Sequence, residues 1–149
     1  MKILRLGLAL VLALTLMTFA SGTVFAGTTP VDQRAEITLL SKGVAMGDAE
    51  LRLRIDEAGM LDLFRIKVDA EGLVPGGTYS LVLGYHVIAT AMADGNGKIS
   101  WDVLCDKFPK TTLDGLKVKV VYGTTLEAPV TLWGKVMASD IELEDPILP

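Results

Sequence analysis

Hydrophobic and polar side chains alternate along most of the chain after residue 32. A period of two is typical of strands that have one face in a hydrophobic core and the other in water. Eight runs follow this pattern, at residues 33–43, 49–56, 64–70, 78–84, 86–93, 98–103, 116–123 and 128–134. Turn-forming residues separate them at intervals of about 8 to 12 residues, as in antiparallel sheets. The pattern predicts an all-β fold, an antiparallel β-sandwich of about eight strands, with a small β-barrel as the alternative.

Two segments depart from this alternation. In residues 102–115, Leu104 and Phe108 have the spacing of a single helical turn, which Pro109 would end. The last residues are acidic and contain proline, which is consistent with either an edge strand or a loose end. We therefore expect one β-sandwich domain over residues 27–138 and an acidic, proline-containing tail over residues 139–149.

The N-terminal residues have the three parts of a secretory signal peptide. Lys2 and Arg5 form a basic start, an apolar run extends to Ala20, and residues 24–26 have the pattern that signal peptidase reads. The alternative is an uncleaved anchor, but Ser, Gly and Thr interrupt the apolar run before it comfortably reaches the roughly 20 residues of a membrane span. We expect cleavage after Ala26, which leaves a secreted or periplasmic protein without an integral membrane span.

Net charge and cysteine content limit the possible functions. Without Lys2 and Arg5, the chain has 12 basic and 18 acidic residues and a net charge of −6. Nucleic-acid binding requires a positive field, so we expect no nucleic-acid partner. Cys105 is the single cysteine, so the core must hold the fold without an internal disulfide. We expect Cys105 to be a small buried residue, with an intermolecular disulfide or a reactive thiol as alternatives.

A short motif precedes the fourth predicted strand. Leu73, Pro75, Gly76 and Tyr79 form the pattern L-x-P-G-x-x-Y. This pattern resembles the corner between two strands of fibronectin type III and related Ig-like sandwiches, including exported bacterial ones. In that corner the Tyr hydroxyl bonds to the backbone a few residues upstream and fixes the chain where it crosses between sheets. The resemblance implies an Ig-like sandwich with structural roles for Pro75, Gly76 and Tyr79, and it implies no functional residue.

A possible calcium-binding loop is centred on four residues, Asp94, Gly95, Asn96 and Gly97. With Gly97 at position 6 of such a loop, Met92 and Val103 fall at positions 1 and 12, where the loop requires carboxylates. The flanking runs also alternate, whereas a calcium loop of this kind has helices on both sides. We therefore predict a hairpin turn in which glycine provides a positive φ, with weak surface calcium binding as an alternative.

Signatures of catalysis are absent from the sequence. His86 is the only histidine, and neither a G-x-S-x-G elbow nor a cysteine-protease signature surrounds a serine or Cys105. No glycine-rich phosphate loop opens a helix. We expect no enzymatic activity, no cofactor and no metal, and a structural role for His86. The alternative is an envelope hydrolase that uses a pair of carboxylates which the sequence does not single out.

The most informative feature is a set of cations at outward strand positions: Arg52, Arg54, Arg65, Lys67, Lys117 and Lys119. If residues 49–56 and 64–70 form a hairpin around Ala58 and Gly59, a two-residue loop places Arg52 opposite Arg65, and a loop two residues longer places Arg54 opposite Arg65. Like charges in such pairs disfavour strand pairing by roughly a few tenths of a kcal/mol. Carboxylates from another strand or from the tail would make this an ordinary salt-bridged face. Alternatively, the stripe binds an anionic glycan, an anionic envelope lipid or an acidic envelope protein.

The two tryptophans, Trp101 and Trp133, both lie in alternating runs. The default position of such large aromatic side chains is the core.

The sequence as a whole favours an exported, non-enzymatic β-sandwich module with a structural or binding role in the cell envelope. Its binding surface would be the cationic stripe or an exposed sheet edge.

Overall fold

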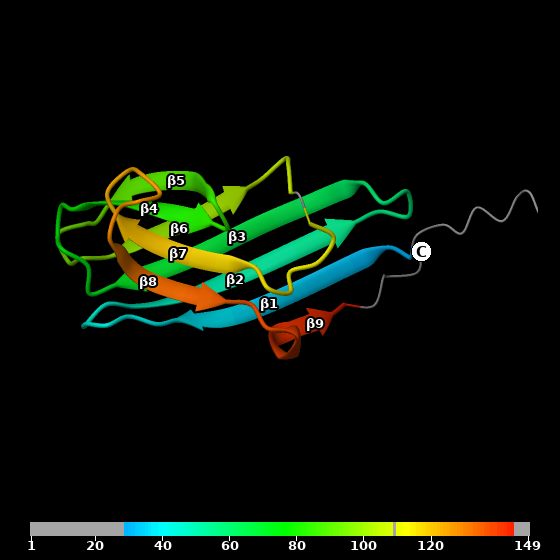
Figure 1. The fold of residues 1–149 in the computed structure, drawn as a ribbon, viewed down its shortest axis with the longest axis horizontal. Coiled ribbons are helices and arrows are strands. Elements are labelled where there is room, and N and C mark those ends of the chain that lie inside the picture. Colours follow the sequence, from blue (N-terminus) through cyan, green and yellow to red (C-terminus); the bar gives the residue numbers. More distant parts are fainter. Residues whose placement is uncertain (1–28, 109, 145–149) are drawn as a thin grey trace, which may run out of the picture.

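The computed structural model describes residues 29–108 and 110–144 of the chain (Figure 1). They form nine strands in two antiparallel sheets, which pack face to face and do not close into a barrel. The predicted all-β sandwich is therefore confirmed, with one strand more than expected. The predicted signal peptide, residues 1–26, lies outside the described residues. Within the described part of the chain, no helix has the length and hydropathy required to cross a bilayer.

The larger sheet has five strands in the order β6-β3-β2-β1-β9. They are β1 (Val31–Leu39), β2 (Met46–Ile55), β3 (Leu61–Glu71), β6 (Ile99–Leu104) and β9 (Ile141–Leu143). Burial alternates along β2 and β3 as the period of two predicts, and Leu51, Leu53, Phe64 and Ile66 are fully buried. Because burying a side chain of this size contributes about 1.5–3 kcal/mol, the inner face of this sheet forms one half of the core.

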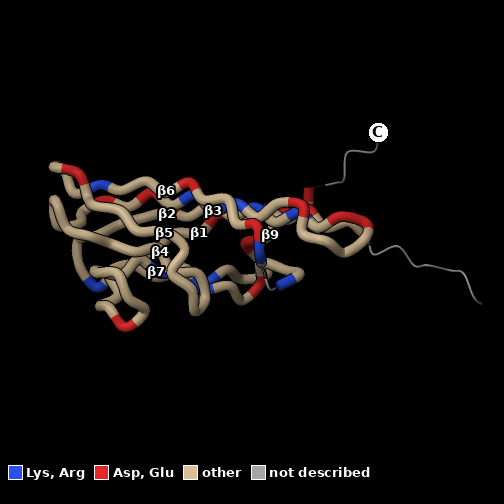
Figure 2. The backbone as a smooth tube through the Cα atoms, turned by 90° about the horizontal axis from the view of Figure 1, so that it is seen from above, with Lys and Arg blue, Asp and Glu red and all other residues tan. Residues whose placement is uncertain are grey.

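The smaller sheet has four strands in the order β5-β4-β7-β8. They are β4 (Thr78–Leu83), β5 (His86–Met92), β7 (Lys117–Tyr122) and β8 (Val130–Lys135). Its inner face contributes Leu81, Val120 and Leu132 to the core, and Figure 2 shows the two sheets as separate layers. At one edge, Leu40 and Trp133 exchange backbone hydrogen bonds of 2.8 and 2.9 Å, which tie the chain beyond β1 to β8.

The corner between β3 and β4 carries the chain from the larger sheet to the smaller one. The backbone N–H of Val74 donates a hydrogen bond of 2.9 Å to the hydroxyl of Tyr79, whose ring is buried. The bond expected for this corner is therefore present. Gly76 has a φ of 72°, a conformation that residues with a Cβ rarely adopt. These features explain why the corner needs both glycine and tyrosine.

The turn around Asp94 joins β5 to β6. Its carboxylate oxygen Oδ1 accepts hydrogen bonds from the backbone N–H groups of Asn96 and Lys98, at 2.8 and 2.9 Å, and Gly97 has a φ of 72°. The predicted tight turn is confirmed, but the predicted hairpin is wrong. β5 pairs with β4 and β6 pairs with β3, so this turn joins the two sheets instead of two neighbouring strands.

This turn and the β3–β4 corner pack against each other. The N–H of Leu73 donates to the carbonyl oxygen of Gly97 at 3.0 Å. The N–H of Gly76 donates to Ala93, and the N–H of Ala93 donates to Gly77, both at 2.9 Å. Two motifs that are separate in the sequence therefore form one structural unit at this end of the sandwich.

The connection from β6 to β7 contains no helix in its described residues, 105–108 and 110–116. The helical turn considered for this segment is therefore absent. Phe108 instead stacks on Phe64 of the core, with ring centroids 4.2 Å apart. In Figure 1 the connection passes over the part of the larger sheet that extends beyond the smaller one.

Part of the acidic tail belongs to the sandwich. Residues Ala138–Asp140 form a short 3₁₀ turn, and β9 then pairs antiparallel with β1 at the edge of the larger sheet. Of the two possibilities for the tail, the edge strand is the one observed. The sandwich therefore extends to Leu143, beyond the expected boundary at residue 138.

Candidate functional site

The outer face of the larger sheet carries a ladder of arginines. β2 and β3 form the predicted hairpin, and Gly59 in its turn has a φ of 77°. The register places Arg52 opposite Arg65, one of the two registers considered, and it places Arg34 of β1 opposite Arg52 on the other side. The loop is longer than two residues, because the register shifts between Arg54 and Ile55 and Ile55 pairs with Leu61. Three like charges therefore lie side by side across three strands.

Carboxylates flank this ladder and form ion pairs with it. Arg52 donates to both oxygens of Asp32 at 3.1 and 3.2 Å, and to Glu144 beyond β9 at 2.7 Å. Arg65 makes a two-pronged contact with Asp102, in which Nε and Oδ1 are 2.7 Å apart. The other pairs are Arg34 with Glu36 and Glu50, and Arg54 with Asp32 and Asp62. Lys67 lies in register between Glu50 and Asp102, so carboxylates flank it as well.

Asp32 is the most enclosed of these carboxylates. Burial raises the pKa of its carboxyl group, but the hydrogen bonds and charges of Arg52 and Arg54 outweigh this effect and keep the pKa below its ordinary value. An external anion would have to displace such internal carboxylates. The salt-bridged alternative therefore describes Arg52, Arg54 and Arg65, whereas Lys67 has carboxylates on both neighbouring strands but forms no salt bridge within the described residues. We call the surface formed by these four residues the arginine face.

The outer face of the smaller sheet has the opposite character. Its four strands contain no Asp or Glu and three cations, Lys117, Lys119 and Lys135. The register places Lys117 directly opposite Lys135. Among residues 29–108 and 110–144, no carboxylate forms a salt bridge with any of the three lysines. This sheet therefore has a like-charge pair without the carboxylates that neutralise the arginine ladder.

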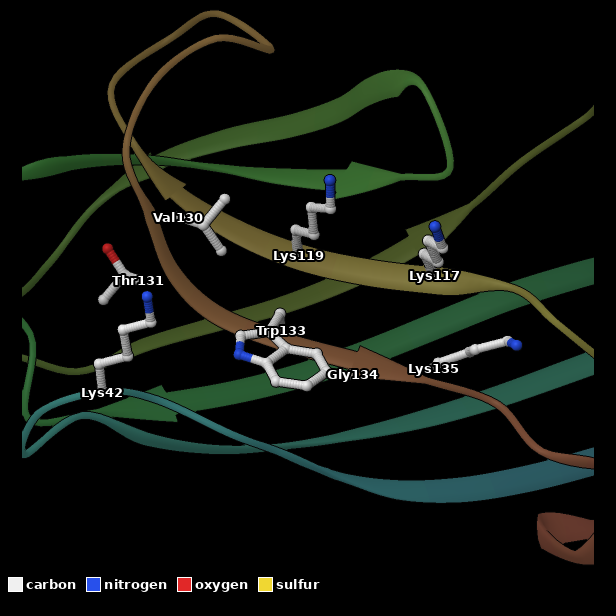
Figure 3. Close-up of a pocket in the computed structure, with 8 residues that line it drawn as sticks. All are labelled: Lys42, Lys117, Lys119, Val130, Thr131, Trp133, Gly134 and Lys135. Carbon is white, nitrogen blue, oxygen red and sulfur yellow. The ribbon is translucent and has the colours of Figure 1, made fainter.

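A shallow depression of about 560 Å³ lies on this surface (Figure 3). Lys117 and Lys119 rise from β7, Trp133 and Lys135 from β8, and Lys42 reaches in from the β1–β2 connection. Trp133 lies opposite Lys119 in the register and is 47% exposed. We call these five residues the lysine face. It combines positive charge with an aromatic surface, which suits an anion that also has an apolar part.

The six predicted binding residues thus divide between opposite surfaces of the sandwich. Four belong to the arginine face, and only Lys117 and Lys119 belong to the lysine face. The sequence interpretation missed Lys42 and Lys135, and it was wrong to expect Trp133 in the core. Trp133 and Lys135 occupy alternate positions of β8 that face outward, so the alternation along this strand could have predicted both of them. Lys42 lies outside any strand, and alternation could not have predicted it. Trp101, by contrast, is buried in the core as predicted.

Two residues of types that catalysis often uses, Cys105 and His86, lie close to one cavity of the described chain. Cys105, which is half-buried instead of fully buried, and His86 line the same cavity at one end of the sandwich. Burial, together with the nearby charge of Asp106, raises the pKa of the Cys105 thiol, which disfavours the reactive thiolate.

Across residues 29–108 and 110–144, no group of three or more His, Cys, Asp or Glu side chains is placed to hold a metal ion. Asp94, a possible calcium ligand, instead accepts two backbone hydrogen bonds in its own turn.

Neither a known protein-family model nor a curated protein sequence matches this chain. The geometry of the chain itself therefore carries the functional conclusion.

Proposed function

We propose that this protein is an exported, non-enzymatic binding module of the cell envelope that takes up an anionic ligand on its lysine face. The N-terminal sequence supports export, since it has the basic start, apolar run and cleavage pattern of a signal peptide. Burial and the charge of Asp106 raise the pKa of Cys105, which argues against a nucleophilic thiol at this one position.

The observation that carries the proposal is the cross-strand pair of Lys117 and Lys135. Two like charges placed opposite each other weaken strand pairing by roughly a few tenths of a kcal/mol. On the larger sheet, the equivalent pair of Arg52 and Arg65 is compensated by Asp32, Glu144 and Asp102. On the smaller sheet no described carboxylate plays that part, so a bound anion would relieve the repulsion and gain several charge contacts at once.

The lysine face is positively charged although the protein as a whole is acidic. The larger sheet contains nine acidic residues and five basic ones, whereas the smaller sheet has three basic residues and no acidic ones. At an ionic strength of about 0.1 M, charges are screened over roughly 10 Å, so a ligand at the lysine face experiences mainly the local positive charge. Anion binding is therefore compatible with a mature net charge of −6.

The test compares two triple variants of the mature chain that change the net charge equally. Lys117→Gln, Lys119→Gln and Lys135→Gln are combined in one, and Arg52→Gln, Arg54→Gln and Arg65→Gln in the other. Sedimentation with phosphatidylglycerol vesicles at low salt measures binding, with phosphatidylcholine vesicles as the neutral control. Since each lysine near an anionic surface contributes about 1 kcal/mol, the lysine variant should bind about 100-fold more weakly.

The arginine variant separates local from overall charge. It should retain most of the binding, provided that circular dichroism shows it to be folded. Equal losses in both variants would mean that net charge alone governs binding, and undiminished binding of the lysine variant would refute the proposal.

A further inference from the structure

We propose that the anionic ligand is a single-chain amphiphile of the fatty-acid type, whose acyl chain enters the cavity beside the lysine face. This inference rests on the proposed function and specifies its ligand. It requires three features to coincide, namely an apolar space of the right size, cations at its opening, and a connection to the lysine face.

The cavity lies where the smaller sheet ends short of the larger one. The β4–β5 turn and the start of β7 border it from the smaller sheet, and Leu61 of β3 borders it from the larger sheet. Residues 105–108, 110, 115 and 116 border it from the β6–β7 connection. Its volume is about 870 Å³. Small-molecule sites in proteins typically have about 300–1,000 Å³, so this space suits one small ligand better than the surface of a bilayer.

The lining of this cavity is largely apolar. Its main apolar members are Leu61, Leu83, Tyr85, Ile88, Phe108 and Leu116. Phe108 is held in place by its stack on Phe64, so this wall is anchored to the core. Such a surface offers little to a sugar or a free phosphate, which require hydrogen-bonding partners, but it favours the burial of methylene groups.

Cations surround the same space. Lys107 and Lys110 approach from the β6–β7 connection, and Lys117 and Lys119 approach from β7. Among the described residues of the lining, Asp106 is the only carboxylate, so their balance of charge is positive. A purely apolar ligand would gain nothing from these ammonium groups, whereas a carboxylate head group would pair with them.

Two residues connect the cavity with the lysine face. Lys117 and Lys119 line both the cavity and the shallow depression beside Trp133. A head group held by these two lysines would therefore place its acyl chain at the cavity. A single ligand of this kind would contact both the like-charge pair of Lys117 and Lys135 and the apolar cavity.

The first experiment measures how affinity depends on chain length in the unaltered mature protein. Calorimetric titration with acetate, octanoate, decanoate and dodecanoate should show binding that tightens by up to about fourfold for each buried methylene. Dodecyltrimethylammonium, which has the same chain and the opposite charge, should bind at least about tenfold more weakly than dodecanoate. Affinity that does not change with chain length would overturn the proposal.

Cys105 provides a second readout in the same protein, because it is the only cysteine and lines the cavity. Dodecanoate should slow the reaction of its thiol with a maleimide several-fold, and acetate should leave the rate unchanged. If dodecanoate binds without protecting Cys105, the acyl chain lies elsewhere and the assigned cavity is wrong.

A pair of variants then tests the cavity itself. Ile88→Trp fills part of the space and should weaken dodecanoate binding at least about tenfold. Val44→Trp introduces the same side chain at a position that is 84% exposed in the β1–β2 connection, and it should have no effect. If circular dichroism shows that Ile88→Trp is unfolded, the chain-length series and the Cys105 rate still decide the question.

The outcomes distinguish this inference from the proposed function. Vesicle binding that depends on the lysines, without any dependence on chain length, would leave the proposed function standing and refute the acyl-chain ligand. Dodecanoate affinity that is unchanged when Lys117 and Lys119 are replaced by Gln would refute the assigned head-group site. Dependence on both supports the inference.

Discussion

Replacing Gly97 with alanine would test whether the β5–β6 turn and the β3–β4 corner form one unit. Gly97 has a φ of 72°, and a Cβ on it would collide with the carbonyl oxygen of Leu73. The left-handed conformation costs a residue with a Cβ about 1–2 kcal/mol. Moving Leu73 away would also weaken its hydrogen bond of 3.0 Å to Gly97, at a net cost of about 0.5–1.5 kcal/mol. We therefore expect the free energy of unfolding to fall by about 3 kcal/mol.

Urea unfolding of the mature chain, followed by tryptophan fluorescence, measures this loss. Gly76→Ala is the first control, because Gly76 also has a φ of 72° but nothing lies within 4 Å of an added Cβ. The free energy of unfolding of the Gly76→Ala variant should fall only by the cost of the left-handed conformation, about 1–2 kcal/mol. Gly95→Ala is the second, since its φ is not positive and the surrounding space is open, and it should change stability by less than about 0.5 kcal/mol. A loss at Gly97 no larger than that at Gly76 would refute the collision and the packed unit that it implies.

The structure makes three further predictions about stability. Tyr79→Phe should cost about 1–2 kcal/mol in urea unfolding, because it leaves the N–H of Val74 without its partner, and an unchanged midpoint would contradict the corner bond. Trp101→Ala should cost about 3–5 kcal/mol and Trp133→Ala less than about 1 kcal/mol; comparable losses would contradict their different burial. The pKa of Asp32 is lowered by folding, so its stabilising contribution is present above the ordinary carboxyl pKa and is lost as the pH falls through the folded value. Thermal melts from neutral to acidic pH should therefore show a smaller acid-induced loss of stability for Asp32→Asn than for the unaltered chain, and equal losses would contradict the ion pairs.

The fold was largely predictable because alternation depends on local sequence alone. The buried positions of β2 and β3 follow the period of two. The pair of Arg52 and Arg65 was one of two registers that the sequence allowed, and loop length alone does not fix it, because the register shifts between Arg54 and Ile55. The connection around Gly97 was not predictable in this way. A glycine-rich turn between two alternating runs looks the same whether its strands pair with each other or enter different sheets, since only the partners β4 and β3 distinguish the cases.

The candidate site was less predictable because it depends on which strands share a sheet. The alternation along each strand correctly predicted that Lys67 and Lys117 face outward. It does not reveal that their two surfaces lie on opposite sides of the sandwich. The pairing of Arg52 with Glu144 joins residues 92 positions apart, which no local pattern reveals. The cavity is likewise formed by the mismatch in length between two sheets, which becomes visible only once the strands are assembled.

The type of cation explains why the two faces differ. All four arginines in the described chain lie on the larger sheet, and each forms an ion pair there. The planar guanidinium group fits a carboxylate with two parallel hydrogen bonds, so arginine suits permanent pairs within a sheet. The ammonium group of lysine is a strongly hydrated point charge on a flexible stem, which can remain in water until an anion arrives. A sheet with Lys117 opposite Lys135 and no acidic residue on its strands is therefore organised for an exchangeable anion, whereas the arginine face already holds its own.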